Sequence, residues 1–413
     1  MSDSPSQNTA VVIGGGQAGG EVALELRRAG FSGRVRLVSD EPFLPYKRPP
    51  LSKTFLAGAA SQDSLCVASQ ASLDKHNIEF LGGVRATRID RKAKTVELSD
   101  GQHLPYDKLA LATGGRPRPL TVPGADLPGI FPLRGIADVD AIRARAAPGK
   151  RLVIVGGGFI GLEVAATTIK MGLKVTVLEG LPRVLARVTA PDVSTFFERV
   201  HRQAGVDLRT STQLTGFAAA GDALRVELAE GNAMEADLVI YGIGMLPNTE
   251  LAAEAGLTVD NGIVVDEFAR SSDPDIVAAG DCTNHPSAYA GRRLRLESVQ
   301  NAMDQARVAA RSLAGKSEAY NALPWFWSDQ YDLKLQMAGL STGHDQTVLR
   351  GDPTRSRTFA LFYLKQGMLL AADTVNRQPD HLVVRKLIAA GARPDPAVLA
   401  DESIPLKSLL PST

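Results

Sequence analysis

The sequence predicts an α/β protein with two units built on parallel sheets, followed by an α+β segment with an antiparallel sheet. Two observations support this prediction. A pattern of strand, glycine-rich loop, helix and strand occurs twice, and residues 325–413 contain short strands separated by turn residues. The 413 residues are enough for two or three domains, since about 150 residues is a common domain size.

The first copy of the pattern lies near the N-terminus. Residues 10–13 form a short apolar run that leads into GGGQAG, where Gly14, Gly16 and Gly19 have the spacing GxGxxG. A helix is expected over 21–30 and a second strand over 35–38. A strand–helix–strand unit of this kind places its strands side by side in a parallel sheet.

The second copy begins with the apolar run 152–155. Gly156, Gly158 and Gly161 follow with the same spacing, and a helix is expected over 163–172 and a strand over 175–178. The first glycine of such a loop allows a tight turn, the second lets the backbone approach a pyrophosphate, and the third lets helix and strand pack closely.

The two loops predict two dinucleotide sites. A pyrophosphate lies well at a helix N-terminus, where unpaired N–H groups and the helix dipole favour negative charge. Two tight structural turns are the alternative. Because each loop stands between a strand and a helix, the sequence favours two Rossmann-like dinucleotide-binding domains, one for FAD and one for a nicotinamide coenzyme.

Acidic residues near the end of each second strand bear on the choice of coenzyme. Glu179 ends the strand of the second copy, where a carboxylate binds ribose hydroxyls and repels a 2′-phosphate. Arg183 is able to hold such a phosphate, but the residue after Glu179 is Gly180, so NADH is favoured over NADPH. In the first copy the aligned residue is Ser39, and Asp40 is the expected ribose ligand, with an ordinary turn acid as the alternative.

Two similar segments mark the joins between the units. Residues 109–114 and 236–243 are apolar strands that run into glycine turns followed by proline. They predict a FAD-binding domain that is interrupted by an inserted NAD-binding domain. The predicted boundaries are 1–115 and 247–324 for FAD, 116–246 for NAD, and 325–413 for a C-terminal domain.

A third glycine segment, 276–281, fits the flavin side. Small residues before Gly280 allow close approach of a ligand, and Asp281 is able to accept hydrogen bonds from ribityl hydroxyls. A helix is expected over 298–313. Its N-terminus would stabilise the negative charge that a reduced flavin acquires.

The C-terminal segment follows a different pattern. Strands separated by turns predict an antiparallel meander, with a helix over 379–390; the strands are expected over 333–337, 347–349, 358–363 and 368–372. Residues 339–343, GLSTG, fit the hydrolase motif GxSxG, but that chemistry needs a strand, a turn and a helix. Here the flanking runs look like strands, which predicts a hairpin turn instead.

Composition excludes several other classes of protein. The 46 basic and 45 acidic residues nearly balance, which argues against a dedicated nucleic-acid binder. The 2 cysteines and 6 scattered histidines suggest neither a disulfide framework nor a metal site. A polar segment at 1–9 and the lack of a long apolar run predict no signal peptide and no membrane span, hence a cytoplasmic protein with free thiols.

These motifs resemble the two-dinucleotide flavoprotein superfamily, with its glutathione-reductase-like fold, and within it the oxygenase-coupled NADH–ferredoxin reductases. The shared segments cover nearly the whole chain in family order. They are 48–53 (RPPLSK), 112–117 (ATGGRP), 156–163, 279–282 (AGDC), 297–299 (ESV) and 324–331 (PWFWSDQY).

The resemblance implies cofactor contacts at particular residues. Those that fall where the family contacts FAD are Ala18, Asp40, Lys53, Ala86, Arg134, Asp281 and Val299. Lys53 and Glu163 fall where a lysine–glutamate pair lies near the flavin and the nicotinamide. A cation there favours electron uptake by the flavin, and a carboxylate in the first helical turn is stabilised by the dipole. The alternatives are that Lys53 is a solvated helix residue and that Glu163 only complements the helix dipole.

Cysteine positions separate this chain from the disulfide reductases of the superfamily. Those enzymes carry a redox cysteine pair soon after the first strand–helix–strand unit, and peroxide-reducing relatives carry one cysteine there. Residues 41–53 contain none. The resemblance therefore implies that electrons leave the flavin without a sulfur relay, and Cys282 is expected to be a small buried residue.

The implied activity is that of an NADH-dependent ferredoxin reductase. Hydride transfer from NADH to FAD would be followed by release of single electrons to a [2Fe–2S] ferredoxin that serves a cytochrome P450 or a ring-hydroxylating dioxygenase. Rubredoxin, a quinone or oxygen as acceptor is an alternative, as is a non-catalytic flavoprotein interaction module.

Two further features bear on the partner. Trp327 is expected either over the flavin region or between domains. A basic cluster would attract an acidic ferredoxin; it comprises Arg292, Arg293, Arg295, Arg307, Arg311 and Lys316.

Overall fold

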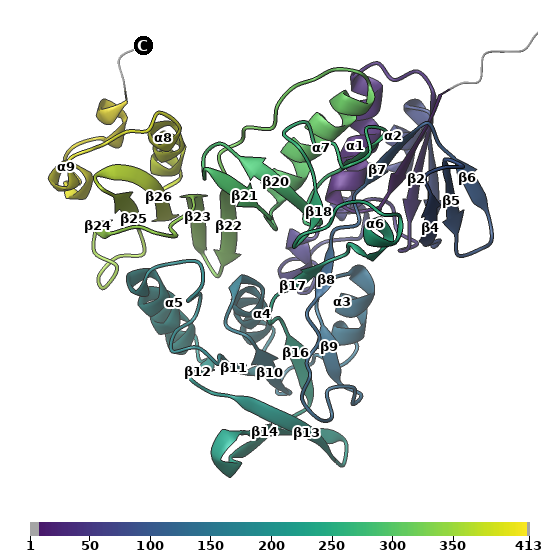
Figure 1. Cartoon of the computed structure of the whole chain (residues 1–413). Coiled ribbons are helices and arrows are strands. Elements are labelled where there is room, and N and C mark those ends of the chain that lie inside the picture. Colours follow the sequence, from purple (N-terminus) through teal and green to yellow (C-terminus); the bar gives the residue numbers. More distant parts are fainter. Residues whose placement is uncertain (1–7, 411–413) are drawn as a thin grey trace, which may run out of the picture. The chain divides into compact units, whose positions relative to one another are not determined.

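The computed structural model describes residues 8–410, so most of the polar N-terminal segment 1–9 lies outside the described residues. The chain forms two compact units (Figure 1). Unit 1 comprises 8–48, 61–116 and 245–322, and unit 2 comprises 49–60, 117–244 and 323–410.

Unit 1 is built on a parallel sheet with the order β3-β2-β1-β7-β19. The strands are β1 (Thr9–Ile13), β2 (Arg34–Ser39), β3 (Ile78–Gly82), β7 (Lys108–Leu111) and β19 (Ile276–Ala278). The side chains of β1 alternate between two cores, as a strand buried on both faces requires. Ala10 and Val12 pack with the helices on one face, and Val11 and Ile13 pack on the other.

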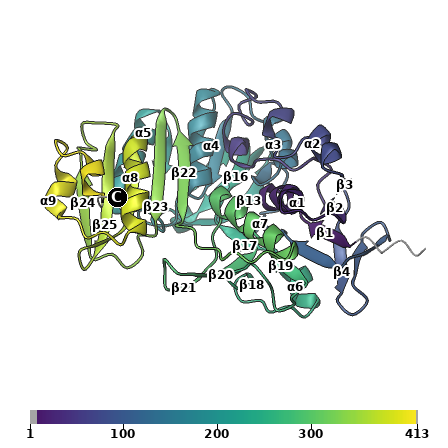
Figure 2. The same ribbon diagram turned by 90° about the horizontal axis from the view of Figure 1, so that it is seen from above.

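The helical face of this sheet carries α1 (Gln17–Arg28) and α7 (Val299–Leu313), which lie side by side (Figure 2). The opposite face packs against an antiparallel sheet with the order β4-β5-β6. The smaller elements of unit 1 are β4 (Ala86–Asp90), β5 (Thr95–Leu98), β6 (His103–Pro105), α2 (Gln70–Lys75), η2 (Asp63–Leu65), α6 (Glu250–Glu254), β18 (Ile263–Val264), β20 (Thr283–Ser287) and β21 (Arg292–Leu294). β8 (Gly115–Pro117) pairs with β17 (Met245–Pro247) where the chain leaves this unit and returns.

Unit 2 contains a second parallel sheet with the order β12-β11-β10-β16-β9. Its strands are β9 (Ile130–Pro132), β10 (Arg151–Val155), β11 (Lys174–Leu178), β12 (Asp207–Arg209) and β16 (Leu238–Tyr241). The associated helices are α3 (Ile136–Arg143), α4 (Phe159–Lys170) and α5 (Pro191–Gln203). Val153 and Val155 face a small antiparallel sheet, β13 (Leu214–Ala220), β14 (Ala223–Leu228) and β15 (Ala233–Ala236), whose last two strands are joined by η3 (Ala229–Gly231).

The same unit contains the C-terminal antiparallel sheet, whose order is β22-β23-β26-β25-β24. Its strands are β22 (Trp325–Gln330), β23 (Leu333–Gly339), β24 (Gln346–Arg350), β25 (Phe359–Lys365) and β26 (Met368–Val375). α8 (Gln378–Ala389) packs on β26 and β23. The other helical segments of unit 2 are α9 (Pro396–Ala400), η1 (Pro49–Ser52) and η4 (Leu406–Leu409).

The predicted fold class is confirmed, and the strands expected from the two glycine patterns are all present. The predicted starts of the two helices are wrong. The helices expected at 21 and 163 begin at Gln17 and Phe159, one turn earlier. The glycines of the loop continue into each helix because the third glycine of the motif is needed for close packing and does not end the helix.

The topology predicted for the C-terminal sheet is also partly wrong. The sheet is antiparallel, but it is not a simple meander, because β23 pairs with β26 and β24 lies at the far edge. Residues 339–343 therefore begin a connection across the sheet and do not form the predicted hairpin turn. No helix follows directly, so the hydrolase geometry is excluded here. Within residues 8–410, no helix is both long and apolar enough to span a membrane.

Candidate functional site

The glycine loop of unit 1 is shaped by two steric demands. Gly14 has a φ of +117°, and a Cβ there would lie 2.1 Å from the carbonyl oxygen of Ala112. A Cβ on Gly19 would lie 1.7 Å from the carbonyl oxygen of Gly14. In contrast, a Cβ on Gly16 would meet nothing within 4 Å. The middle glycine therefore borders open space, where a ligand backbone contact is possible.

The loop of unit 2 has the same shape. Gly156 has a φ of +110°, and a Cβ on Gly161 would lie 2.0 Å from the carbonyl oxygen of Gly156. Gly158, like Gly16, has nothing within 4 Å of a Cβ. Neither α1 nor α4 has a side-chain cap or an acid in its first turn. Both helix N-termini are thus suited to an anionic pyrophosphate.

The residues at the ends of β2 and β11 occupy equivalent places. The Glu179 carboxylate accepts hydrogen bonds from the backbone N–H of Gly157 at 2.7 Å and of Leu181 at 2.8 Å. It therefore lies against the glycine loop, as predicted for a ribose ligand. In unit 1 a Cβ on Gly15 would lie 2.3 Å from Ser39 Oγ. Asp40 is more exposed and pairs with Arg85 at 3.2 Å.

Arg183, the residue able to hold a 2′-phosphate, is engaged elsewhere. Its Nη1 donates to the carbonyl oxygen of Thr189 at 2.8 Å and to Ser194 Oγ at 2.6 Å. Its Nη2 donates to the carbonyl oxygen of Ala186 at 3.0 Å. These contacts make Arg183 a brace for the loop that leads into α5.

The Asp281 segment is held close to the first glycine helix. Gly280 has a φ of +87°, and a Cβ there would lie 3.0 Å from the Cβ of Ala18. Asp281 follows directly, and α7 begins at Val299 after a Ser298 cap whose Oγ accepts the N–H of Asn301 at 3.1 Å. The predicted residues Ala18, Asp281 and Val299 therefore belong to the same unit as the loop at Gly14.

Two predicted FAD contacts belong to elements other than the glycine loop, α1 and α7. Ala86 begins β4 and pairs with Leu98, next to an irregularity in the β4–β5 pairing. Arg134 lies in unit 2, in the turn before α3, where its backbone N–H donates to Asp138 Oδ2 at 2.8 Å.

The Lys53–Glu163 pair is present in unit 2. Lys53 Nζ lies 2.6 Å from Glu163 Oε2, and the Glu163 side chain is only 3% exposed. Ser52 Oγ donates to the same oxygen at 2.5 Å, and Ser328 Oγ donates to Oε1 at 2.7 Å. The alternative of a solvated lysine is wrong. A buried carboxylate needs such partners, and here one cation and two hydroxyls provide them.

The predicted place of Glu163 in the first helical turn is wrong. α4 begins at Phe159, so Glu163 lies in the second turn, beyond the reach of the dipole effect that was expected. Ser52 and Ser328 were not predicted, although both lie inside the family-like segments 48–53 and 324–331. No spacing rule joins residues that are 111 and 165 positions apart in the chain.

Trp327 belongs to an aromatic group in unit 2. Its ring centroid lies 5.6 Å from that of Trp325 and 6.4 Å from that of Phe326. Phe326 in turn lies 4.7 Å from Phe159, the first residue of α4. Phe326 thus joins β22 to α4, while the two expected places for Trp327 stay predictions.

Comparison with known proteins gives a match over nearly the whole chain. The family model for pyridine nucleotide-disulphide oxidoreductases matches residues 8–306, and a reductase C-terminal model matches 325–410. The chain belongs to this oxidoreductase family. Putidaredoxin reductase CamA from Pseudomonas putida is 46% identical over 98% of this chain and 97% of its own. An anthranilate 1,2-dioxygenase system ferredoxin–NAD(+) reductase component from Burkholderia cepacia is 43% identical over 97% of this chain and 98% of its own.

A solved structure agrees with these relatives. The crystal structure of the covalent putidaredoxin reductase–putidaredoxin complex matches with a TM-score of 0.94 and 47% identity, covering 97% of this chain and 98% of that chain. The predicted resemblance to ferredoxin reductases is therefore confirmed.

Both cysteines of this family member are free thiols. Cys282 is fully buried, as predicted, and its Sγ lies 3.4 Å from the carbonyl oxygen of Ala279. Burial raises the pKa of the Cys282 thiol, which keeps it protonated. Cys66 lies opposite Tyr46 in an isolated bridge of unit 1. The cysteines thus form no disulfide, although the family description names disulphide chemistry.

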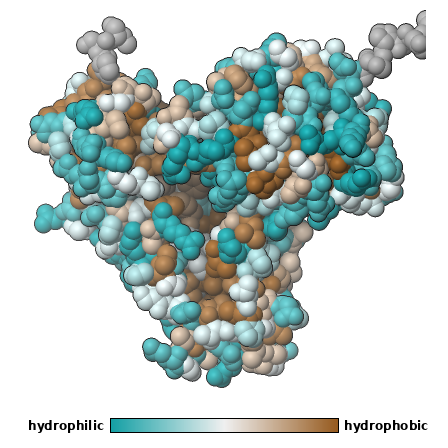
Figure 3. Space-filling view, viewed as in Figure 1, coloured by the Kyte–Doolittle hydropathy of each residue, from teal (hydrophilic) through white to brown (hydrophobic). Residues whose placement is uncertain are grey.

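The basic cluster of the family member is largely paired. Arg295 contacts Glu297 at 2.5 Å, Arg307 contacts Asp304 at 3.1 Å, and Arg311 pairs with Glu318. Arg293 donates to the carbonyl oxygen of Val265 at 2.6 Å. Figure 3 shows hydrophilic and apolar side chains interspersed on the viewed face of unit 1. The cluster is therefore a mixed surface and not a uniformly positive one.

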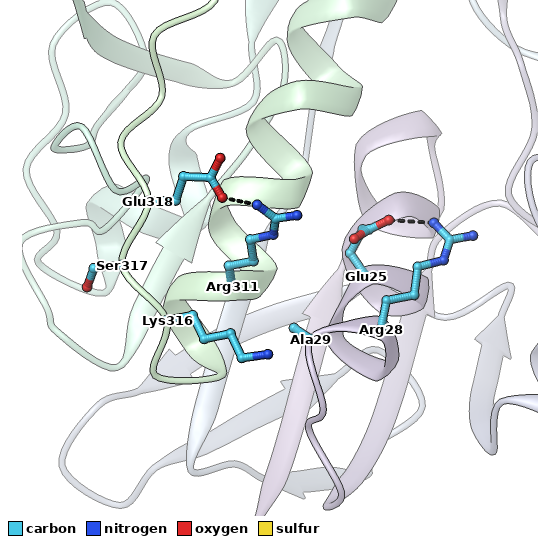
Figure 4. Close-up of a pocket in the computed structure, with 7 residues that line it drawn as sticks. All are labelled: Glu25, Arg28, Ala29, Arg311, Lys316, Ser317 and Glu318. Carbon is cyan, nitrogen blue, oxygen red and sulfur yellow. Dashed lines mark hydrogen bonds and ion pairs between the residues drawn. The ribbon is translucent and has the colours of Figure 1, made fainter.

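A hollow in unit 1 lies among some of these residues (Figure 4). It has a volume of about 250 Å³ and is lined by Glu25, Arg28, Ala29, Arg311, Lys316, Ser317 and Glu318. It borders the C-terminal end of α1, whereas Gly16 stands at the N-terminal end. Glu25 pairs with Arg28, and Arg311 pairs with Glu318, so acids and bases alternate around the hollow.

Proposed function

We propose that this protein is an FAD-containing reductase that takes electrons from NADH and delivers them singly to a [2Fe–2S] ferredoxin. The ferredoxin would serve a cytochrome P450 or a ring-hydroxylating dioxygenase. One observation carries the proposal: two glycine loops, each at an open and uncapped helix N-terminus, occur in a chain that matches ferredoxin reductases along almost its full length.

Each dinucleotide is assigned to its own part of the chain. FAD is held by 1–115 and 247–324 and NADH by 116–246, while 325–413 contributes to the ferredoxin surface. The FAD-binding residues proposed in these segments are Gly14, Gly16, Ala18, Gly19, Asp40, Lys53, Ala86, Asp281 and Val299, and Arg134 is proposed as one further FAD contact from the segment 116–246. Those proposed for NADH are Gly156, Gly158, Gly161, Glu163 and Glu179. The open Cβ positions at Gly16 and Gly158 support these assignments, since a pyrophosphate needs that space.

Bound FAD supplies the redox chemistry, because it accepts an electron pair and releases electrons one at a time. The chain provides charge and orientation. Lys53 supplies a positive charge that favours electron uptake by the cofactor, and Glu163 orients the nicotinamide amide. The salt bridge of 2.6 Å between them supports a joint role.

NADH is favoured over NADPH by the surroundings of Glu179. Its carboxylate is held against the glycine loop by two backbone N–H donors, where it repels a 2′-phosphate. The nearby cation Arg183 is bound to two carbonyl oxygens and a hydroxyl.

The free thiols support two further parts of the proposal. Electrons leave FAD without a cysteine relay, and the protein works in a reducing compartment, the cytoplasm.

Anaerobic stopped-flow measurements test this function. We expect FAD in the purified protein to be bleached rapidly by NADH and much more slowly by NADPH. The reduced protein should then pass electrons to a [2Fe–2S] ferredoxin faster than to rubredoxin, a quinone or oxygen. A colourless preparation that takes up no FAD would contradict the proposal. Rapid bleaching with a preference for one of the other acceptors would favour that acceptor.

A further inference from the structure

A chain of buried hydrogen bonds extends from Glu163 through unit 2. Ser328 Oγ lies 2.7 Å from Glu163 Oε1, and Gln330 Nε2 lies 3.2 Å from Ser328 Oγ. Gln330 Oε1 lies 2.9 Å from His201 Nε2, and His201 Nδ1 lies 2.9 Å from Tyr331 Oη. The side chains of Glu163, Ser328, Gln330 and His201 are all buried.

The chemistry of these groups allows one consistent direction for the bonds. Gln330 Oε1 only accepts, so His201 Nε2 carries the proton and donates to it. His201 Nδ1 then accepts from the Tyr331 hydroxyl. Gln330 donates through Nε2 to Ser328 Oγ, which leaves the Ser328 hydroxyl to donate to Glu163 Oε1. Every donor in the chain therefore points toward the Glu163 carboxylate.

This direction requires a neutral imidazole at His201. Burial lowers the pKa of His201 to about 4, outweighing the opposite effect of its hydrogen bond with Gln330, so the ring is uncharged in neutral solution. Tyr331 lies in the two-residue turn that joins β22 to β23. Its φ of 59° is left-handed, which a tyrosine rarely adopts, and its ring packs 5.0 Å from that of His201.

We propose that Ser328, Gln330 and His201 are positioning residues, which hold the Glu163 carboxylate turned toward the nicotinamide. The inference rests on the proposed function of Glu163. Aligned hydrogen bonds in a buried chain strengthen one another, so each member supports the charge at the far end. The amide of Gln330 makes the chain a device for orientation, because an amide does not relay protons.

The hydrogen-bonded residues come from three elements of unit 2. Glu163 comes from α4, His201 from α5, and Ser328 and Gln330 from β22. The side chains of β22 alternate, so Ser328 and Gln330 share one face of the strand. The C-terminal sheet thereby supplies a buried donor to a residue of the nucleotide-binding part of unit 2.

A double-mutant cycle on the full-length, FAD-loaded protein tests the proposal. We compare Ser328→Ala in the wild-type and Glu163→Gln backgrounds, and measure NAD+ affinity by calorimetry and flavin bleaching by NADH. In the wild-type background Ser328→Ala should lower both the NAD+ affinity and the rate of flavin bleaching about tenfold, as loss of a hydrogen bond to a charged group predicts. In the Glu163→Gln background the change should be less than about twofold, because the charge that Ser328 supports is gone.

Two variants serve as controls. Ser328→Thr keeps the hydroxyl and should restore most of the affinity. Thr168→Val lies on the same helix as Glu163 and removes a buried hydroxyl whose Oγ1 donates only to the carbonyl oxygen of Val164 at 2.7 Å. It should match the wild type. Equal losses from Ser328→Ala in both backgrounds would overturn the proposal and assign Ser328 a structural role.

Nitrogen NMR of histidine-labelled protein gives a readout that does not depend on activity. The His201 signal, identified by its loss in His201→Gln, should show protonated Nε2 and unprotonated Nδ1 between about pH 5.5 and pH 8. A cationic ring or the opposite tautomer would contradict the chain. If the wild-type protein were not bleached by NADH, the proposed function would fail while this measurement would still decide the direction of the bonds.

Discussion

At the scale of single residues, the site depends on buried charges with specific partners. Glu163 has three donors, and only one of them, Lys53, carries a charge. Glu179 has two backbone donors, and within residues 8–410 it forms no salt bridge. The first carboxylate is thus paired with a cation, while the second is bound only by backbone groups and has no counter-ion beside it.

Removal of Lys53 should show how strongly Glu163 depends on it. We expect Lys53→Met to reduce the free energy of unfolding by about 3 kcal/mol, because it leaves a buried carboxylate without its counter-ion. Adding Glu163→Gln should recover part of this loss, since the uncompensated charge is then absent. Urea unfolding followed by circular dichroism provides the measurement. A double variant that is less stable than Lys53→Met would contradict the coupling.

Substitution of Glu179 should change the choice of coenzyme. Glu179→Ala removes the carboxylate that repels a 2′-phosphate, so the ratio of kcat/KM for NADH to that for NADPH should fall at least about tenfold. Steady-state reduction of a ferredoxin with each coenzyme gives this ratio. The exposed Asp192 at the start of α5 provides a control, because Asp192→Asn removes an acid outside the proposed site. An unchanged ratio in Glu179→Ala would show that another residue selects the coenzyme.

At the scale of elements, the glycine loops need positions without a side chain, whereas the strand that carries Asp373 needs a buried polar side chain. The loops require the absence of a Cβ, either for the fold or for the ligand. The C-terminal sheet requires a buried polar contact with the helix beside it. Both demands lead to measurements that separate folding from binding.

Gly16, which borders open space, and Gly19, which packs against the backbone, should respond differently to replacement by alanine. Gly16→Ala places its Cβ in open space and at a φ of −88°, so the apoprotein should melt within a few degrees of the wild type. Its FAD affinity should nevertheless fall at least about tenfold, because the Cβ occupies the path of the pyrophosphate. Gly19→Ala should lower the melting temperature of the apoprotein as well, since its Cβ would meet the backbone at 1.7 Å. Equal melting temperatures for the two variants would refute this distinction.

A buried acid should give the C-terminal sheet a pH dependence. Asp373 on β26 accepts a hydrogen bond from Tyr363 Oη at 2.6 Å, and the same hydroxyl accepts the N–H of Ala190 at the start of α5 at 2.9 Å. Burial raises the pKa of Asp373 to about 7, from a usual value of 3.8. The folded state therefore binds a proton that the unfolded state has released between these values, and stability should fall as the pH rises through this window.

Asp373→Asn should remove this part of the pH dependence. The slope for one proton is about 1.4 kcal/mol per pH unit, and the amide still accepts the Tyr363 hydroxyl. We expect the difference in unfolding free energy between the variant and the wild type to grow between about pH 5 and pH 7. Chemical unfolding at several pH values measures the difference. A constant difference would show that Asp373 does not titrate in this range.

At the scale of the whole molecule, local rules predicted the repeating parts and missed the contacts between distant segments. The parallel sheets followed from apolar runs beside glycine loops, and the helix expected over 298–313 is α7. The place of β24 at the edge of the C-terminal sheet was not predicted, because the loop after Gly339 contains no signal that distinguishes a hairpin from a connection across a sheet. Likewise, Ser52 and Ser328 reach Glu163 only once η1 and β22 pack against α4, which the sequence order does not reveal.

Because the whole molecule is nearly neutral, its attraction for a ferredoxin should depend on a few local cations. The chain has a net charge of only +1, and Arg295, Arg307 and Arg311 pair with carboxylates, so attraction to an acidic partner rests on a few cations such as the exposed Arg292. We expect ferredoxin reduction to slow several-fold as salt rises from about 20 to about 300 mM, while bleaching by NADH changes less than about twofold. Arg292→Glu should flatten this dependence, whereas the same change at Arg209 on β12 should not. Rates of ferredoxin reduction that ignore ionic strength would show that shape, and not charge, guides the partner to this surface.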